Sequence, residues 1–128
     1  MFTQLLQYSD FGLLMLRIVV AIIFIYHALP KIRSSRLVAR GMDMSQGFVF
    51  VLGWVELLSS IGLILGIYIQ LASLLLSIVM TGAIYSKMIR WRMPFSSREG
   101  TGWEFDFILL AANIMILLSG GGGFALFK

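Results

Sequence analysis

The sequence predicts an all-α integral membrane protein, a four-helix bundle with a short tight turn between its second and third spans. Its 128 residues are 59% hydrophobic and 12% charged, which is about half the charged fraction of a soluble domain. The charged residues are also unevenly placed, since most of them lie in two basic segments that separate long apolar runs. We therefore expect a single transmembrane domain over residues 1–128.

The first apolar run is GLLMLRIVVAIIFIYHAL, residues 12–29. As a helix it would be about 27 Å long, close to the thickness of the hydrocarbon core of a bilayer. Asp10 precedes the run and is expected to act as its N-cap. Pro30 disfavours a helical conformation in the residue before it, so the helix is expected to stop near Leu29.

The loop after this span is basic. It contains Lys31 and three arginines, Arg33, Arg36 and Arg40, against one acid, Asp43. The arginines recur at helical spacing, which predicts a short helix lying at the membrane surface. We expect their guanidinium groups to contact lipid head groups.

The next run, residues 48–86, has one charged residue over a length that would be roughly 58 Å as a single helix. Because the hydrocarbon core is only about 30 Å thick, the run must fold back on itself. Residues 66–70 offer the natural turn, which gives spans over residues 48–68 and 71–86.

A second basic segment leads into the last span, residues 102–118. Trp91 and Trp103 lie near this boundary and suit the interface between water and lipid. Arg90 and Arg92 are expected to contact lipid head groups, as the arginines of the first loop do.

The distribution of positive charge predicts the orientation. Eight of the ten Lys and Arg residues lie in the two basic segments, and the link between the second and third spans has none. The positive-inside rule then places both basic loops in the cytoplasm and both termini outside, in the plasma (inner) membrane of a bacterium. The N-terminus has no basic n-region, so no cleavable signal peptide is expected. The basic balance is thus assigned to topology and lipid contact, and not to nucleic acid.

Glu56 is the most informative residue because it is an acid well inside an apolar run. Ionising it in hydrocarbon is costly unless a cation, hydrogen-bond donors or water lie near. The first span offers two candidates, Arg17 and His27, and we expect the helices to bring at least one of them to Glu56. The predicted polar core also includes Lys31, one helical turn after His27, and Glu104 of the last span.

Simpler explanations of these residues stay open. Arg17 can extend its charge to the outer interface. Glu56 can stay protonated and bind Ser59, Ser60 or a backbone carbonyl. His27 is the sole histidine; it suits proton exchange or contact with a quinone, because its free pKa lies near neutrality, and it can equally be an interface histidine.

Glu104 has a competing structural explanation. Residues 101–104, Thr-Gly-Trp-Glu, match the capping-box pattern, with Thr101 as the N-cap and Glu104 reaching back to its amide. Asp106 would then continue an acidic first turn that complements the helix dipole.

Small residues predict where helices pack closely. Gly62 and Gly66 form a GxxxG pattern in the second span, and Ser73, Ser77 and Thr81 fall on one face of the third. We interpret all five as packing residues and not as catalytic ones.

The chain contains no cysteine, which excludes disulfides, thiolate metal sites and iron–sulfur ligation by its own residues. A single histidine has no second haem ligand to join it. We therefore expect no metal site and no cofactor held within the chain alone.

The order of these features resembles the DoxX family of small four-helix membrane proteins, over nearly the whole chain. The resemblance is carried by Leu16-Arg17, by Phe24-Ile25-Tyr26-His27-Ala28 with Lys31, by Glu56-Leu57-Leu58 leading into Gly62 and Gly66, by Gly102-Trp103-Glu104, and by the glycine-rich residues 120–123. It implies association with a quinone-reducing oxidoreductase system.

Three functions follow from these observations. The first is a membrane subunit of a quinone-linked oxidoreductase complex, in which the polar core contacts a quinone or relays protons. The second is a non-catalytic accessory subunit that stabilises a larger membrane complex. The third is a pathway for protons or small solutes, which would require several copies of the chain. The first two require other membrane protein subunits as partners.

The topology can be tested with reporter fusions. Fusions at Ser35 and Ser97 should report a cytoplasmic location, and a fusion after Lys128 an external one, because eight cations lie in the two basic loops. A cytoplasmic reporter after Lys128 would contradict the number of spans or their orientation.

Overall fold

A computed structural model of the chain describes residues 1–96 and 102–126. These residues are helical apart from short links, which confirms the all-α prediction. The elements are a 3-10 turn η1 (Thr3–Tyr8), helices α1 (Ser9–Arg33), α2 (Ser35–Met42), α3 (Gln46–Leu65) and α4 (Ile69–Tyr85), a π-helical turn η2 (Ser86–Arg90) and helix α5 (Trp103–Ser119).

Three helical segments of the described residues are long and apolar enough to cross a membrane. They are η1 with α1 (Thr3–Arg33), α3 (Gln46–Leu65), and α4 with η2 (Ile69–Arg90). Helix α5 has 17 residues, about 25 Å of helix, and is therefore shorter than a typical span. The described part of the structure has five α-helices, because α2 forms in the basic loop after α1 in addition to the four helices of the predicted bundle.

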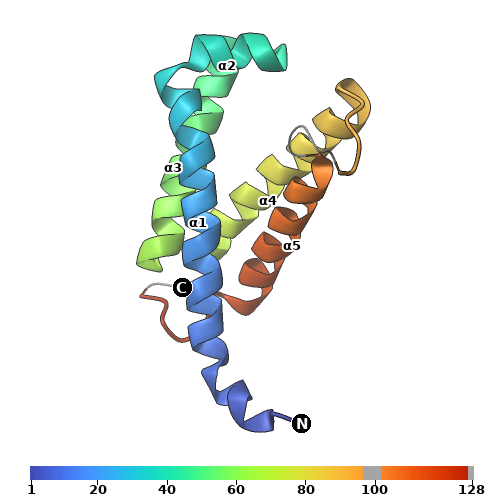
Figure 1. Cartoon of the computed structure of the whole chain (residues 1–128). Coiled ribbons are helices and arrows are strands. Elements are labelled where there is room, and N and C mark those ends of the chain that lie inside the picture. Colours follow the sequence, from blue (N-terminus) through green and yellow to red (C-terminus); the bar gives the residue numbers. More distant parts are fainter. Residues whose placement is uncertain (97–101, 127–128) are drawn as a thin grey trace.

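The helices form two pairs (Figure 1). Helix α1 packs along α3, and α4 packs along α5, while α3 and α4 also contact each other. Only residues 66–68 connect α3 to α4. In Figure 1 the two pairs diverge toward the end of the molecule at which α2 lies.

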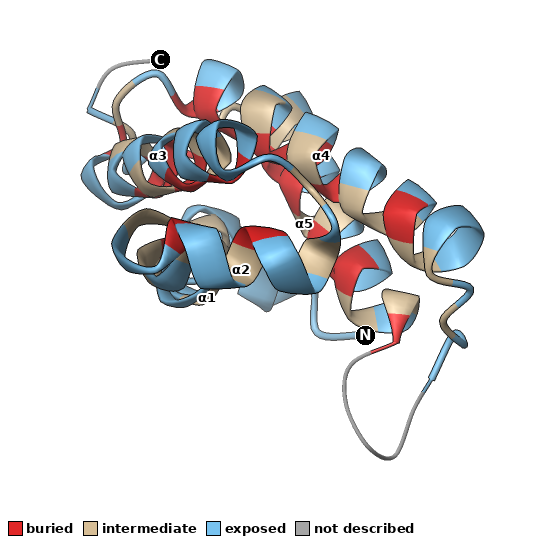
Figure 2. Cartoon of the chain, turned by 90° about the horizontal axis from the view of Figure 1, so that it is seen from above, coloured by how far each residue is buried: buried red, intermediate tan, exposed pale blue. Residues whose placement is uncertain are grey.

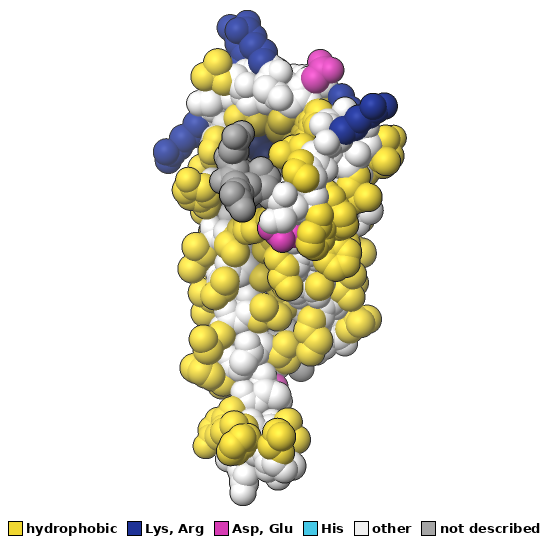
Figure 3. All heavy atoms as spheres, turned by 45° about the vertical axis from the view of Figure 1, so that its right-hand side comes forward, with side chains coloured by type: hydrophobic (Ala, Val, Ile, Leu, Met, Phe, Trp, Pro, Cys, Tyr) yellow, Lys and Arg dark blue, Asp and Glu magenta, His cyan; other side chains and the backbone are white. Residues whose placement is uncertain are grey.

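The core lies where the two pairs meet. Figure 2 shows the buried residues on the faces of α3, α4 and α5 that turn toward one another. The larger apolar members are Val20, Phe24, Leu63, Ile69, Leu76, Leu109 and Ile116. The outward faces of the helices are apolar too, and in Figure 3 hydrophobic side chains cover the middle of the molecule while Lys and Arg gather at one end. This pattern is typical of a protein with a lipid-facing surface.

Helices α1 and α3 lie very close together at Gly53. A Cβ atom built on Gly53 would lie 2.9 Å from Lys31 Cβ, 3.0 Å from Ile32 Cγ1 and 3.2 Å from the Ala28 carbonyl oxygen. Position 53 therefore requires glycine, because the two helices are too close together for a larger side chain. Small residues have the same role at many contacts between membrane helices. The sequence analysis did not single out Gly53.

Helix α1 does not stop at Leu29, as the sequence predicted, but continues through Pro30 to Arg33. Pro30 has no N–H to give the carbonyl one turn before it, which costs about 3 kcal/mol in a helix interior. The packing of Lys31 and Ile32 against Gly53 holds this last turn in place. Tertiary contact thus overrides the local preference.

The N-terminus of α1 also differs from the prediction. Asp10 lies inside the helix, whose N-cap is Tyr8 without a side-chain cap. The Asp10 carboxylate instead accepts a hydrogen bond of 2.8 Å from the backbone N–H of Gly123. Asp10 therefore anchors the segment that follows α5 to the start of α1.

The first basic loop forms a helix, as its arginine spacing predicted. In α2 Arg36 and Arg40 are exposed, and so is Arg33 just before it. Arg90 and Arg92 near η2 are exposed as well. Their contact with lipid head groups stays a prediction.

The predicted packing residues divide into two groups. Gly62 lies near the Ile67 carbonyl and Ala72, whereas Gly66 is the C-cap of α3 in the left-handed conformation, with φ of 76°. The GxxxG pattern is therefore a helix end and not a face between long helices. The second group lies on α4 and consists of Ser73, Ser77 and Thr81. Each of their hydroxyls donates a hydrogen bond to the backbone carbonyl four residues earlier in α4.

Substitution of Gly53 should test the close approach of α1 and α3. We expect Gly53→Ala to cost about 1–3 kcal/mol, because the new methyl group would overlap the stem of Lys31. The measurement is thermal unfolding of the purified protein in detergent. Gly47→Ala is the control, because a Cβ on Gly47, also in α3, meets nothing within 4 Å. Equal melting temperatures for the two variants would contradict the packing described here.

Candidate functional site: a cavity between the helix pairs

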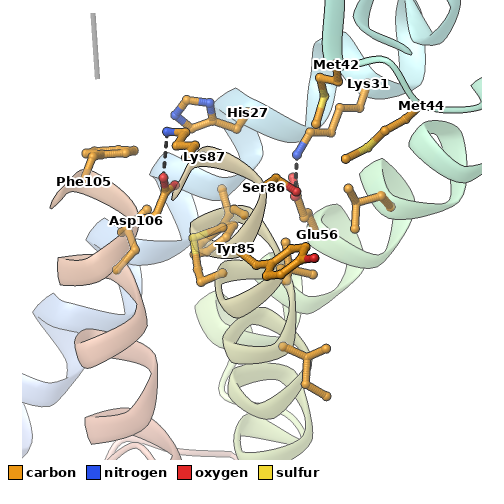
Figure 4. A pocket seen from close by; sticks show the side chains of 18 of the residues that line it. His27, Lys31, Met42, Met44, Glu56, Tyr85, Ser86, Lys87, Phe105 and Asp106 are labelled. Carbon is orange, nitrogen blue, oxygen red and sulfur yellow. Dashed lines mark hydrogen bonds and ion pairs between the residues drawn. The ribbon is translucent and has the colours of Figure 1, made fainter. Parts of the chain in front are cut away.

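A cavity of about 600 Å³ lies between the two helix pairs where they diverge. Its walls are mainly apolar, and they include Phe24 of α1, Leu52 of α3, Val79 of α4 and Leu109 of α5. The polar residues that line it include His27, Lys31, Glu56, Ser86, Lys87 and Asp106 (Figure 4). A mostly apolar cavity with a few convergent polar groups is the usual form of a small-molecule site.

The first polar feature of the cavity is an ion pair between α1 and α3. Lys31 Nζ lies 2.5 Å from Glu56 Oε1. The Glu56 side chain is fully buried, whereas that of Lys31 retains 16% exposure. Glu56 is therefore neutralised by a cation, as the sequence predicted, but its partner is Lys31 and not Arg17 or His27.

The direction of helical side chains explains this pairing. Gly53 of α3 faces the last turn of α1, so Glu56, one turn further along α3, is level with a residue about one turn before Lys31. Side chains of a helix lean toward its N-terminus. Because α1 and α3 run in opposite directions, Lys31 leans into the molecule, Glu56 leans toward Lys31, and the two meet.

The second oxygen of Glu56, Oε2, is buried and has no hydrogen-bond partner among the described residues. The Ser60 hydroxyl, which could have reached it, donates instead to the backbone carbonyl of Glu56 at 2.6 Å. An ionised carboxylate can accept at both oxygens. Glu56, which is one of the residues that line the cavity, therefore has one acceptor that no described donor satisfies.

A second ion pair lies on the opposite helix pair, between η2 and α5. Lys87 Nζ lies 2.6 Å from Asp106 Oδ2, with side-chain exposures of 16% and 8%. The sequence analysis interpreted Asp106 as a complement to the helix dipole and did not include Lys87. Burial in the structure distinguishes Asp106 from Glu104, because Asp106 lies on one stripe of α5 with the buried residues Leu109, Asn113 and Ile116.

His27 lies beside this second pair. Its ring centroid is 5.7 Å from that of Phe105 on α5, and Figure 4 shows it next to Lys87. It is exposed and lines the cavity. His27 therefore contacts the α5 side of the cavity and not Glu56.

Glu104 does not belong to the cavity. It is exposed, and it is two residues from Asp106, which places it on another face of α5. Thr101, the predicted N-cap, lies outside the described residues. At the described start of α5 the N-cap is Gly102, and the amides of Trp103 and Glu104 donate to the carbonyls of Pro94 and Phe95.

Arg17 is fully buried but lies toward the opposite end of the bundle. Its Nη2 donates to the Phe124 carbonyl at 3.4 Å, and its side chain approaches Gly66 and Gly121. Its Nε and Nη1 have no partner among the described residues. Arg17 therefore does not pair with Glu56, because its side chain leans toward the N-terminus of α1, away from the cavity.

The arrangement suits a ligand that is apolar in its body and polar at its edge. The cavity walls can cover an apolar ring or chain, and the two ion pairs can exchange hydrogen bonds with its polar groups. Among the residues that the structure describes, no group of three or more His, Cys, Asp or Glu side chains could hold a metal ion.

Comparison with known proteins agrees with the membrane-protein reading. A Bacillus subtilis (strain 168) protein that carries the name "Putative oxidoreductase CatD" is 25% identical over 120 residues, which cover 91% of this chain and 85% of that protein. An "Uncharacterized protein" of Haemophilus influenzae (strain ATCC 51907 / DSM 11121 / KW20 / Rd) is 29% identical over 122 residues, 94% of this chain and 91% of that protein. No solved structure matches.

The residues that match a known family include all of helix α3 and most of the residues that line the cavity. The family model DoxX matches residues 12–88, more than half of the chain, and this range includes Arg17, His27, Lys31 and Glu56. The chain belongs to the DoxX family.

Proposed function

We propose that this protein is an integral membrane subunit that binds a quinone-type head group in its cavity and serves a quinone-linked oxidoreductase complex. The observation that carries the proposal is the cavity itself, which combines apolar walls with one lysine–carboxylate pair on each helix pair. Its volume of about 600 Å³ falls in the range of small-molecule sites.

The residues present fit such a ligand. Each ammonium group has three N–H donors, and Lys31 and Lys87 each retain some exposure after pairing with an acid. These donors can bind the carbonyl oxygens of a quinone ring that the apolar walls enclose. A bound quinone supplies two-electron, two-proton chemistry, for which Glu56 Oε2 and the His27 ring offer places to hold a proton.

The proposal includes a membrane placement. We infer four spans, with α5 as the fourth in spite of its length, because it packs along α4 and exposes apolar side chains on its outer face. The cavity then opens at the end that carries the two basic segments. The charge distribution favours the cytoplasm for that end, and the bacterial relatives support the plasma membrane of a bacterium.

The electron carrier of this proposal belongs to a partner subunit. The name of the Bacillus subtilis relative supports a link to oxidoreductase chemistry, and the chain has no cysteine with which to ligate a metal cluster. The alternative of a solute pathway has less support, because the packed core below the cavity includes Val20, Leu63, Leu76 and Ile116.

A substitution that fills the cavity tests the proposal. Gly82 lines the cavity, and a Cβ there meets nothing within 4 Å, so Gly82→Phe should occupy the space without strain. We expect Gly82→Phe to bind a short-chain benzoquinone about tenfold or more weakly than the unmodified protein does, which is a loss of about 1.4 kcal/mol. Quenching of tryptophan fluorescence in the purified protein measures this binding.

The matched control is Gly12→Phe on α1. A Cβ on Gly12 also meets nothing within 4 Å, but Gly12 does not line the cavity. This variant should bind the quinone as the unmodified protein does. An equal affinity of Gly82→Phe for the benzoquinone, or no saturable binding of either the benzoquinone or its hydroquinone to the unmodified protein, would contradict the proposed function.

A further inference from the structure

We infer that the cavity recognises the reduced, hydroxyl-bearing form of its ligand, a hydroquinone, in preference to the quinone. This inference rests on the proposed function and adds to it the chemical form that the site selects. It follows from the acceptor that the Lys31–Glu56 pair leaves unsatisfied and from the second lysine–carboxylate pair that lines the same cavity.

The first step concerns Glu56. Its Oε1 is held by Lys31, and its Oε2 has no partner among the described residues although it is buried. A buried acceptor without a donor is destabilising, and more so when the group is charged. Glu56 Oε2 therefore lacks a hydrogen-bond donor within the part of the chain that the structure describes.

The second step concerns the lysine beside it. Lys31 keeps unused N–H groups but is 16% exposed, so water can satisfy them and they require no ligand. A carbonyl oxygen of a quinone could accept from Lys31 but could give nothing to Glu56. A hydroxyl group does both, since it donates its hydrogen to Glu56 Oε2 and accepts from Lys31 Nζ.

The third step concerns the opposite wall. Lys87 and Asp106 form a second pair of the same kind, also with the acid the more buried partner. Figure 4 shows the two pairs at different sides of the same cavity, with His27 beside Lys87. A ring with two hydroxyl groups on opposite edges matches one lysine–carboxylate pair on each side.

The inference separates two chemically similar ligands. A site that binds a hydroxyl through buried groups discriminates strongly against an analogue without it, because those groups are then left unpaired. The quinone and the dimethyl ether of the hydroquinone carry oxygen atoms at the same two ring positions as the hydroquinone, but neither has a donor hydrogen. Both should therefore bind more weakly than the hydroquinone.

The test compares three probes with the purified full chain under anaerobic conditions. They are a decyl hydroquinone, the corresponding decyl benzoquinone and the O,O′-dimethyl ether of the hydroquinone. We expect the hydroquinone to bind at least about tenfold more tightly than either of the others, since a hydrogen bond to a charged group is worth about 1.5–3 kcal/mol. Isothermal titration calorimetry gives the three dissociation constants.

Variants locate the preference. Glu56→Gln replaces the carboxylate with an amide that can donate to a carbonyl, so the preference for the hydroquinone should fall by about tenfold or reverse toward the quinone. Glu104→Gln is the matched control, because it removes an exposed carboxylate outside the cavity. It should leave all three dissociation constants unchanged.

The outcomes are distinguishable. Equal affinities for the hydroquinone and the benzoquinone in the unmodified protein would overturn this inference and leave the proposed function in place. Binding of none of the probes would overturn both. If Glu56→Gln does not fold, the comparison of the three probes on the unmodified protein still decides the question, because it uses no variant.

Discussion

The ion pair between Lys31 and Glu56 determines how the first half of the molecule is built. A carboxylate within an apolar bundle requires a cation, and removing one partner of such a pair typically costs about 3–5 kcal/mol. Lys31 can reach Glu56 only if α1 continues past Pro30 and lies close to α3. The glycine at position 53 permits that distance. The pair, the proline inside the helix and the glycine contact are therefore three parts of one arrangement.

The same arrangement explains why the polar groups are divided between the two ends of the bundle. Lys31, Glu56, Lys87 and Asp106 lie where the helix pairs diverge, and each acid is matched with a lysine. At the other end Arg17 is enclosed by the α3–α4 link and the segment after α5. Packed apolar residues of the core separate the cavity at one end from the buried Arg17 at the other.

Much of the fold could be predicted because it depends on hydropathy. The apolar runs gave the long helices, and the arginine spacing gave α2. The ends of α1 were predicted less well. Tertiary contact carries the helix past Pro30, and Asp10 lies inside the helix and does not act as its N-cap. The close contact at Gly53 could not be foreseen without the register of α1 against α3.

The site was predicted in part. Glu56 was identified correctly as a buried acid that needs a cation, and Lys31 was named as a neighbour. The predicted pairing of Glu56 with Arg17 was wrong, because composition does not reveal how deep each residue lies in the bundle. Side chains lean toward the N-terminus of their helix, which moves Arg17 away from Glu56. Asp106 was assigned to the helix dipole because two acids lie close together at the start of α5, and only burial tells the inner acid from the exposed Glu104.

A double-mutant cycle on Lys31 and Glu56 tests the central claim most directly. Unfolding free energies in detergent of Lys31→Met, Glu56→Gln and the double variant should give a coupling energy of about 1–3 kcal/mol, because the double variant leaves no isolated charge. The parallel cycle of Arg17→Met with Glu56→Gln should be additive to within about 0.5 kcal/mol. Coupling near zero for Lys31 with Glu56, or stronger coupling for Arg17, would contradict this account.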